Sequence, residues 1–140
     1  MADDHEKMES VMRKDSGRIL LMDDEDCVLE VGGELLAYLG FQVTFARNGQ
    51  EALDLYQAAL REKRPFAAVI MDLTVPGGMG GREAIRRLRE IDPGVKAIVS
   101  SGYSSDPVMV HYAEYGFDAV VAKPYKIETL SEILKRLCNR

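Results

Sequence analysis

The sequence has few cysteines, no long apolar run and no excess of positive charge, and each absence excludes a class of protein. Its two cysteines, Cys27 and Cys138, form no CxxC pair, so neither a zinc site nor a disulfide framework is indicated. No segment approaches the roughly 18 apolar residues of a membrane-spanning helix, and residues 1–16 are too polar for a signal peptide. The net charge of −5 argues against direct binding to nucleic acid. We therefore expect a reducing, cytoplasmic setting without direct contact to membrane or nucleic acid.

The composition is that of one globular domain. The 140 residues are 46% hydrophobic and 29% charged, the balance of an ordinary soluble protein. A chain of this length buries roughly two-thirds of its unfolded surface, so it needs no disulfide or structural metal. Residues 1–17 are mostly polar and end in Ser16-Gly17, which predicts a mobile or partly helical leader or linker. The domain itself is expected over residues 18–138.

Short apolar runs alternate with segments of helical period throughout this domain. The runs that predict buried strands lie at residues 18–22, 41–46, 66–71, 95–100 and 118–122. The segments that predict helices lie at residues 27–39, 49–60, 81–92, 107–115 and 127–137. This alternation with short connections predicts right-handed crossovers. The expected fold class is therefore α/β, a doubly wound five-stranded parallel sheet with helices on both faces.

The stretch from Val69 to Pro76, VIMDLTVP, is an apolar run that contains one acidic residue, Asp72, and ends at a proline. It places Asp72 at the carboxyl end of the third predicted strand. In open parallel sheets, ligands bind at that edge, because the loops there set polar groups over a rigid base. Taken alone, however, Asp72 is explained as well by a helix cap or a turn.

Further polar residues follow the other predicted strands and favour a functional interpretation. Asp23 and Asp24 follow the first strand, Ser101 the fourth and Lys123 the fifth. Carboxylates that converge on one crevice repel one another, and a hard divalent cation such as Mg²⁺ relieves that repulsion. Because Mg²⁺ in proteins commonly binds phosphate oxygens as well, the site is suited to a phosphoryl group. Lys123 would balance the charge of that group, and the Ser101 hydroxyl would donate a hydrogen bond to it.

Four motifs carry a resemblance to a known family. They are LLMDDE, VIMDLTVPGGMGG, IVSSGYS and VVAKPY, and they occur in that family's order and at about its spacing. The sequence from Arg18 to Leu137 resembles the receiver domain of two-component response regulators, which has a flavodoxin-like (βα)5 fold. Its glycine-rich loop at residues 76–81 is one residue longer than the commoner form, which makes it more similar to receivers of hybrid sensor histidine kinases.

The resemblance implies a phosphorelay role and a set of metal ligands. It makes Asp72 the phosphoacceptor, which takes a phosphoryl group from the phosphohistidine of a histidine kinase or a histidine phosphotransfer domain. It implies that Asp24, Asp72 and the backbone carbonyl of Thr74 hold Mg²⁺ directly, whereas Asp23 acts through water. A phosphorylation-dependent dimer is compatible with this role.

The resemblance also implies a conformational switch. Lys123 would pair with the phosphoryl group, and the Lys123-Pro124 peptide bond would be cis, a form that proline makes accessible. Ser101 would close on a phosphoryl oxygen and shift a two-state arrangement of the last two βα units, whose surface would carry the output. In the family a Tyr or Phe three residues before the lysine completes this switch, but here the position is Val120. The rotating aromatic latch is therefore not expected.

Two alternatives stay open. Asp24-Glu25-Asp26 also matches the DxD pattern of haloacid-dehalogenase-like phosphatases, in which Asp24 would be the nucleophile and Asp26 its acid/base partner. The small size, the absence of a cap insertion and the lack of a role for Asp72 argue against that enzyme. The second alternative keeps the receiver fold but makes it a phosphorylation-independent interaction module, which Val120 would permit.

Other polar residues are interpreted as surface. His111 lies on the predicted helix 107–115 and has no predicted partner. Four arginines recur on the predicted helix 81–92 and are expected to form a solvated face: Arg82, Arg86, Arg87 and Arg89. We therefore assign none of them to the site.

Overall fold

A five-stranded sheet forms the centre of the described part of the protein. The computed structural model describes residues 16–138, so the expected leader lies almost entirely outside the described residues. All neighbouring strands pair in parallel, in the order β2-β1-β3-β4-β5. The strands are β1 (Arg18–Met22), β2 (Gln42–Ala46), β3 (Ala68–Asp72), β4 (Ala97–Ser101) and β5 (Ala119–Ala122). The α/β fold predicted from the alternating pattern is confirmed.

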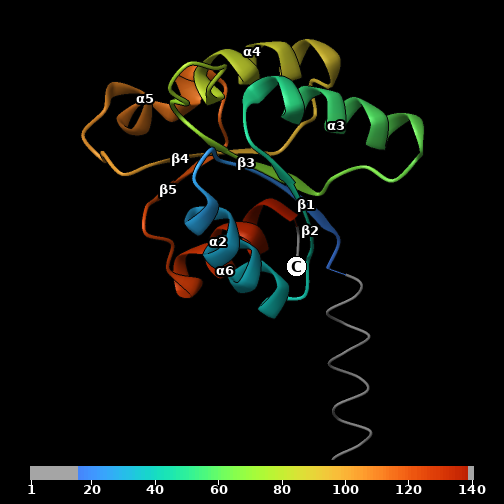
Figure 1. Cartoon of the computed structure of the whole chain (residues 1–140), viewed down its shortest axis with the longest axis horizontal. Helices are drawn as coiled ribbons and strands as arrows, with labels where there is room; N and C mark the ends of the chain where they lie inside the picture. The colour runs from blue at the N-terminus through green and yellow to red at the C-terminus, as the bar shows by residue number, and fades with distance from the viewer. Residues whose placement is uncertain (1–15, 139–140) are drawn as a thin grey trace, which may run out of the picture.

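Helices cover both faces of this sheet. They are α2 (Asp26–Tyr38), α3 (Gly49–Arg61), α4 (Gly81–Ile91), α5 (Pro107–Val110), the 3₁₀-helix η1 (Tyr112–Tyr115) and α6 (Ile127–Cys138). Figure 1 shows α3, α4 and α5 on one side of the sheet and α2 and α6 on the other. Successive strand residues point to opposite faces, so β1 sends Leu20 and Met22 into one apolar core and Ile19 and Leu21 into the other. No helix among residues 16–138 is both long and apolar enough to cross a bilayer.

Two helix starts follow directly from the sequence. The side chain of Asn48 accepts a hydrogen bond from the backbone N–H of Glu51 at 3.0 Å, which caps α3. The side chain of Asp106 accepts one from the N–H of Val108 at 2.9 Å and caps α5, with Pro107 at the first helical position. These short polar residues therefore fix where the two helices begin.

The helix expected over residues 107–115 is not continuous. It breaks at His111, whose backbone dihedrals are φ −112° and ψ 41°, so that α5 is followed by a separate 3₁₀ turn. Val108, Val110 and His111 all have lower helix propensity than Ala or Leu, so little local preference opposes the break. Gly116, with φ 101°, then ends the turn in a left-handed conformation that glycine adopts readily.

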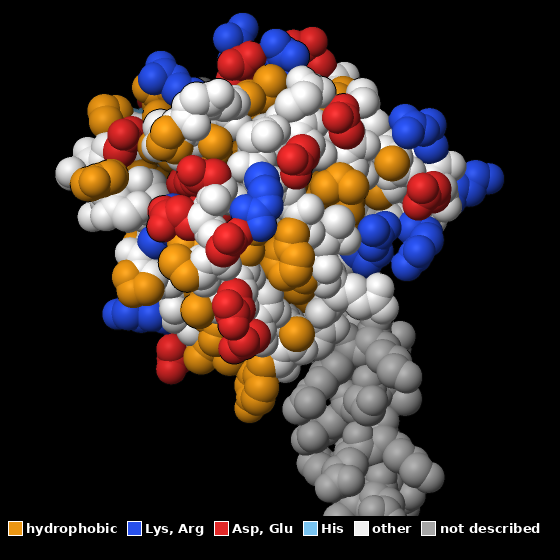
Figure 2. All heavy atoms as spheres, viewed as in Figure 1, with side chains coloured by type: hydrophobic (Ala, Val, Ile, Leu, Met, Phe, Trp, Pro, Cys, Tyr) orange, Lys and Arg blue, Asp and Glu red, His pale blue; other side chains and the backbone are white. Residues whose placement is uncertain are grey.

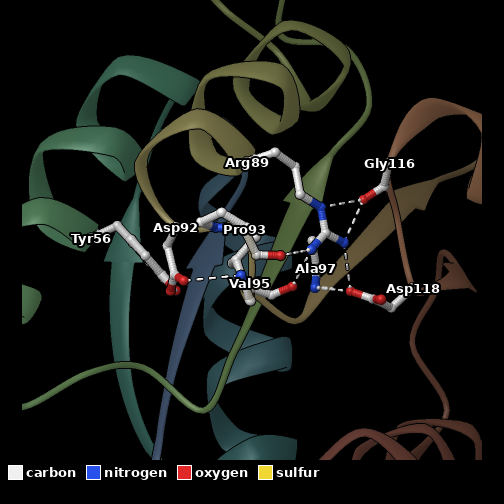
Figure 3. A network of polar contacts seen from close by, with 9 residues as sticks. Tyr56, Arg89, Asp92, Pro93, Val95, Ala97, Gly116 and Asp118 are labelled. Atoms are coloured by element: carbon white, nitrogen blue, oxygen red, sulfur yellow. Dashed lines mark hydrogen bonds and ion pairs between the residues drawn. The ribbon is translucent and has the colours of Figure 1, made fainter.

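The amino-terminal edge of the sheet is closed by a polar network around Arg89 (Figure 3). The Arg89 guanidinium donates to the Gly116 carbonyl at 2.7 and 3.0 Å, to the Pro93 carbonyl at 2.9 Å and to the Val95 carbonyl at 2.8 Å. It also pairs with the Asp118 carboxylate at 3.0 Å. The expectation of a solvated face was thus wrong for Arg89, which ties the end of α4 to the segments that lead into β4 and β5.

Neighbouring bonds extend this network toward α3. Asp118 also accepts from the backbone N–H of Ala97 at 2.8 Å. The Tyr56 hydroxyl donates to the Asp92 carboxylate at 2.6 Å, and the other oxygen of Asp92 accepts from the Gly94 N–H at 3.0 Å. The Asp92 carboxylate thus accepts from the turn before β4, and the Asp118 carboxylate accepts from the first residue of β4.

Candidate functional site

The carboxyl edge of the sheet gathers the polar residues singled out in the sequence. Asp72 is the last residue of β3 and only 4% exposed, and Asp23 directly follows β1 and is fully buried. Ser101 is the last residue of β4, rather than the first after it, and Lys123 directly follows β5. The chain leaves β1 for β2 on one side and returns to β3 on the other, so the acidic residues lie at the switch point where such sheets bind ligands.

Lys123 lies between two of these carboxylates. Its Nζ donates to Asp23 Oδ2 at 3.0 Å and to Asp72 Oδ1 at 3.2 Å. A carboxylate oxygen of Glu25 lies 3.9 Å from the same nitrogen. The Lys123 side chain is 15% exposed, so the ammonium group is largely removed from water while it holds these acids together.

The pKa of Asp72 reflects its burial first and the negative charge beside it second. Burial raises the pKa of Asp72 from its usual 3.8 to about 6, the negative charge of Asp23 adds to the rise, and Lys123 partly opposes it. Burial alone would lower the pKa of Lys123, but the hydrogen bond to Asp23 and the charge of Asp72 outweigh it, so this pKa is raised. The single positive charge of Lys123 faces the carboxylates of both Asp23 and Asp72, so it does not neutralise the edge, and a further cation would stabilise it.

Oxygen ligands for such a cation lie at the mouth of the site. Asp23, Asp24 and Glu25 each have a carboxylate oxygen within 4.8 Å of the others. Asp24 and Glu25 are exposed, whereas Asp23 and Asp72 are buried below them. An all-oxygen donor set fits a hard divalent ion such as Mg²⁺. Thr74 lies in the loop after β3, with its side chain exposed.

The two candidate switch residues lie on the strands beside Asp72. The Ser101 hydroxyl accepts a hydrogen bond from the Tyr103 N–H at 3.0 Å, and Ser101 is 6% exposed. Val120 pairs in register with Val99 of β4 and is half-buried against the core on the α4 side. No aromatic ring is available at position 120 to follow a movement of Ser101.

The structure adds three residues that sequence reasoning missed. Glu25 joins the acidic group, whereas Ser100 and Tyr125 form a buried hydrogen bond of 2.9 Å between their hydroxyl groups beneath it. A serine next to Ser101 and an aromatic residue two positions after Lys123 were the available signals, but their meaning depends on contact across the sheet. The Lys123-Pro124 peptide bond is cis, as the resemblance implied.

Asp26 does not join this site. It is the first residue of α2, and its carboxylate pairs with Arg47 after β2. Figure 2 shows acidic side chains gathered over α2, and the exposed acids of that helix are Asp26, Glu30 and Glu34. The pairing of Asp24 with Asp26 that a haloacid-dehalogenase-like phosphatase needs therefore has no support in the geometry.

Comparison with known proteins identifies the family. Residues 19–135 match the response regulator receiver domain, so the chain belongs to this family of two-component signalling proteins. A response regulator receiver protein of Anaeromyxobacter sp. (strain Fw109-5) is 36% identical over 116 residues, which are 83% of this chain and 46% of that protein. The chain thus spans about half the length of this relative.

Two solved structures resemble the chain in fold and carry informative ligands. Response regulator TrrA of Thermotoga maritima, solved in complex with Mg²⁺-BeF, is 28% identical with a TM-score of 0.74 over 86% of this chain and 98% of that chain. The receiver domain of sensor histidine kinase PA1611 of Pseudomonas aeruginosa PAO1 is 25% identical with a TM-score of 0.73, over 89% of this chain and 98% of that one. It was solved with magnesium coordinated in its active-site cleft.

Proposed function

We propose that this receiver domain accepts a phosphoryl group on Asp72 from the phosphohistidine of a histidine kinase or a histidine phosphotransfer domain. The observation that carries the proposal is the placement of Lys123 Nζ within 3.0 Å of Asp23 and 3.2 Å of Asp72 at the carboxyl edge of the sheet. Family membership supports the same role, because two-component receivers act by this transfer. A cytoplasmic location forms part of the proposal.

Asp72 acts as the nucleophile in the transfer. One of its carboxylate oxygens attacks phosphorus in line with the imidazole nitrogen of the donor. The new O–P bond forms as the P–N bond breaks, and the electron pair of that bond stays on the imidazole nitrogen. The product is an acyl phosphate on Asp72, and Lys123 then exchanges its bond with the free carboxylate for one with a phosphoryl oxygen.

Asp24, Asp72 and the backbone carbonyl of Thr74 are the proposed direct ligands of Mg²⁺, with Asp23 acting through water. The ion supplies positive charge that offsets the negative charge on the transferring phosphoryl oxygens. The raised pKa of Asp72 and the cluster of Asp23, Asp24 and Glu25 support a cation at this place. The Mg²⁺ present in the receiver of PA1611 points the same way.

Ser101 responds to phosphorylation of Asp72. Its hydroxyl turns from the Tyr103 N–H toward a phosphoryl oxygen, and this shift changes the arrangement of the β4–α5 loop and the surface of β5 and α6. Because position 120 is Val, the change does not pass through a rotating ring. If Val120→Tyr alters partner binding only in the phosphorylated protein, this position is coupled to the switch; unchanged binding in both states would remove Val120 from it.

The partner approaches beside the lysine. Cys27, Val28 and Val31 of α2 line a mostly apolar hollow together with the segment Lys123 to Tyr125. A helix of the kinase or phosphotransfer domain would fill this hollow and bring its phosphohistidine to Asp72. The resemblance to receivers of hybrid kinases supports such a partner, and a phosphorylation-dependent dimer remains part of the prediction.

The test is intact mass after incubation with acetyl phosphate, with and without Mg²⁺. Wild type should gain one phosphoryl group only with Mg²⁺, the gain should be lost on acid or base treatment, and Asp72→Asn should gain none. Asp106→Asn is the matched control, since it changes another aspartate at this edge of the sheet to a residue that also caps helices.

Two results would contradict the proposal. Labelling of Asp72→Asn at the wild-type level would move the acceptor elsewhere. Absence of labelling in wild type with both acetyl phosphate and a panel of phosphorylated histidine phosphotransfer domains would favour a phosphorylation-independent interaction module.

A further inference from the structure

The segment that carries Lys123 is held to β4 at both of its ends. The backbone N–H of Lys123 donates to the Ser101 carbonyl at 3.0 Å. Two residues later, beyond Pro124, the Tyr125 hydroxyl hydrogen-bonds the Ser100 hydroxyl at 2.9 Å. Ser100 is fully buried and Tyr125 is 9% exposed. The last two residues of β4 thus fix the segment on either side of the proline.

Ser100 also contacts the strand of the phosphoacceptor. It pairs in register with Asp72 of β3, and its carbonyl accepts from the Leu73 N–H at 2.8 Å. One residue of β4 therefore links the acceptor to the lysine segment, through its backbone on one side and its side chain on the other. A shift of Tyr125 relative to Ser100 changes the distance that Lys123 must span to reach Asp72.

The ring of Tyr125 lies against α2. A Cβ at Gly32 would come within 3.0 Å of Tyr125 Cε2 and 2.9 Å of Leu21 Cδ2, so a side chain there would press on this ring. A glycine inside a helix otherwise costs about 1 kcal/mol relative to alanine. The contact explains why α2 tolerates it, and it ties the Lys123 segment to the helix that follows the acidic residues.

Packing alone does not require the two hydroxyl groups. Phenylalanine would bury the same ring, and alanine would fill most of the space of Ser100 without an OH group to satisfy. A hydrogen bond between two buried hydroxyl groups restricts how their side chains are placed relative to each other, because the bond is strong only over a narrow range of distance and angle. Burial raises the pKa of Tyr125 to about 12, so its hydroxyl keeps its proton at neutral pH.

We propose that Tyr125 is a positioning residue for phosphotransfer. Its hydrogen bond to Ser100 holds the backbone of Lys123 where the ammonium group reaches Asp23 and Asp72 together. This inference rests on the proposed function, and it assigns to the residue pair a role in the reaction that acts through Lys123.

The test compares two buried tyrosines, each of which makes one side-chain hydrogen bond. Tyr125→Phe should lower the limiting rate of Asp72 phosphorylation by acetyl phosphate about tenfold, the rate equivalent of one neutral hydrogen bond. The Mg²⁺ concentration for half-maximal rate should not change, because no proposed ligand is altered. Tyr56→Phe removes a partly buried bond to Asp92 at the opposite edge of the sheet and should leave the rate unchanged.

A double variant separates positioning from stability. Tyr125→Phe alone leaves the Ser100 hydroxyl buried without its partner, so urea unfolding should show a loss of stability. Adding Ser100→Ala removes that unsatisfied group and should recover most of the stability but none of the rate. Recovery of both together would mean that the pair serves packing alone and would overturn the proposal.

A second background tests whether Tyr125 acts through the lysine. In Lys123→Met, adding Tyr125→Phe should slow phosphorylation no further. An equal slowing in both backgrounds, or a wild-type rate in Tyr125→Phe itself, would overturn the inference while leaving Asp72 as the acceptor. The two proposals fail differently, because failure of the proposed function removes labelling of Asp72 from wild type as well.

Discussion

The amino-terminal and the carboxyl edges of the sheet each hold a basic side chain beside carboxylates. The charge of the basic side chain is matched by its partners only at the amino-terminal edge. At the amino-terminal edge, Arg89 meets one carboxylate, that of Asp118, and three backbone carbonyls, with every bond between 2.7 and 3.0 Å. At the carboxyl edge, Lys123 contacts Asp23 and Asp72 and lies 3.9 Å from Glu25, and Asp24 lies beside them. The first edge is satisfied by the chain itself, whereas the second keeps an excess of negative charge.

This difference separates the part of the molecule that stabilises it from the part for which we propose a reaction. The Arg89 network joins α4 to the turns before β4 and β5, and the charge of its guanidinium is matched there by the Asp118 carboxylate. The carboxyl edge retains charge that burial makes unfavourable, which shows in the raised pKa of Asp72. Proteins tolerate such local imbalance where binding or catalysis needs it.

The largest expected effect is at the lysine. Lys123→Met should slow phosphorylation of Asp72 by acetyl phosphate about a hundredfold, equivalent to about 2.7 kcal/mol, because the charge on the transferring phosphoryl oxygens loses a donor. Mass spectrometry of timed samples gives the rate. Lys126→Met, an exposed lysine in the same connection, is the control and should behave as wild type. A wild-type rate in Lys123→Met would show that phosphorylation of Asp72 does not depend on the charge of Lys123.

Removal of the arginine should affect stability instead of rate. Arg89→Met should lower the free energy of unfolding by about 2 kcal/mol, because three carbonyls and the Asp118 carboxylate lose their bonds to the guanidinium. The partial exposure of the pair keeps the loss below that of a fully buried pair. Urea titration measures it, with exposed Arg86→Met on the same helix as the control. A tenfold loss of phosphorylation rate in the folded Arg89→Met would contradict the separation of the two edges.

A carboxylate removed from each edge should change stability in opposite directions. In Mg²⁺-free buffer at pH 8, Asp72→Asn should stabilise the protein by about 1 kcal/mol, whereas Asp118→Asn should destabilise it. The rise of the Asp72 pKa from 3.8 to about 6 sets an upper limit near 3 kcal/mol, reduced because Lys123 loses an acceptor.

The free energy of unfolding should depend on pH through Asp72. A pKa that is raised on folding means that the folded state binds the proton more tightly, so the free energy of unfolding falls as pH rises from about 4 through 6. The gain from Asp72→Asn should therefore be present at pH 8 and nearly absent at pH 4. Denaturant titrations at pH 4 and pH 8 measure this gain in stability. A larger gain at pH 4 than at pH 8 would contradict a raised pKa of Asp72 in the folded protein.

A similarly small effect is expected at Tyr56. Tyr56→Phe should cost about 1 kcal/mol, because its hydrogen bond to the Asp92 carboxylate is only partly buried. Thermal unfolding monitored by circular dichroism measures it, and the phosphorylation rate should not change. A stability change near zero would show that the bond to Asp92 contributes nothing beyond packing.

The fold was predictable because its signals are local. Buried strands of a parallel sheet read as short apolar runs, and the caps Asn48 and Asp106 mark helix starts without reference to the rest of the chain. The helix expected over 107–115 was the exception. Its periodic apolar residues fit a helix, but the break at His111 depends on how the segment packs between its cap and Gly116.

The candidate site was predictable in its types of residue and less so in its contacts. Asp23, Asp72, Ser101 and Lys123 were expected at one edge because carboxyl ends of parallel strands meet there. In the sequence Arg89 could not be told apart from the other arginines of α4. Its place on the helix was predictable, but the backbone carbonyls that it contacts were not. Ser100 and Tyr125 are 25 residues apart and meet only across the sheet.

The sequence alone determined the order of strands and helices along the chain, the family resemblance and the residue types at the carboxyl edge. Each of these depends on patterns within a few residues. The tertiary structure decided which charges are satisfied and which are not. Hydrogen bonding and desolvation depend on distances of a few ångströms between segments remote in the chain. For that reason Arg89 became part of a closed network, and Asp72 was left with a raised pKa beside a lysine that it shares with Asp23.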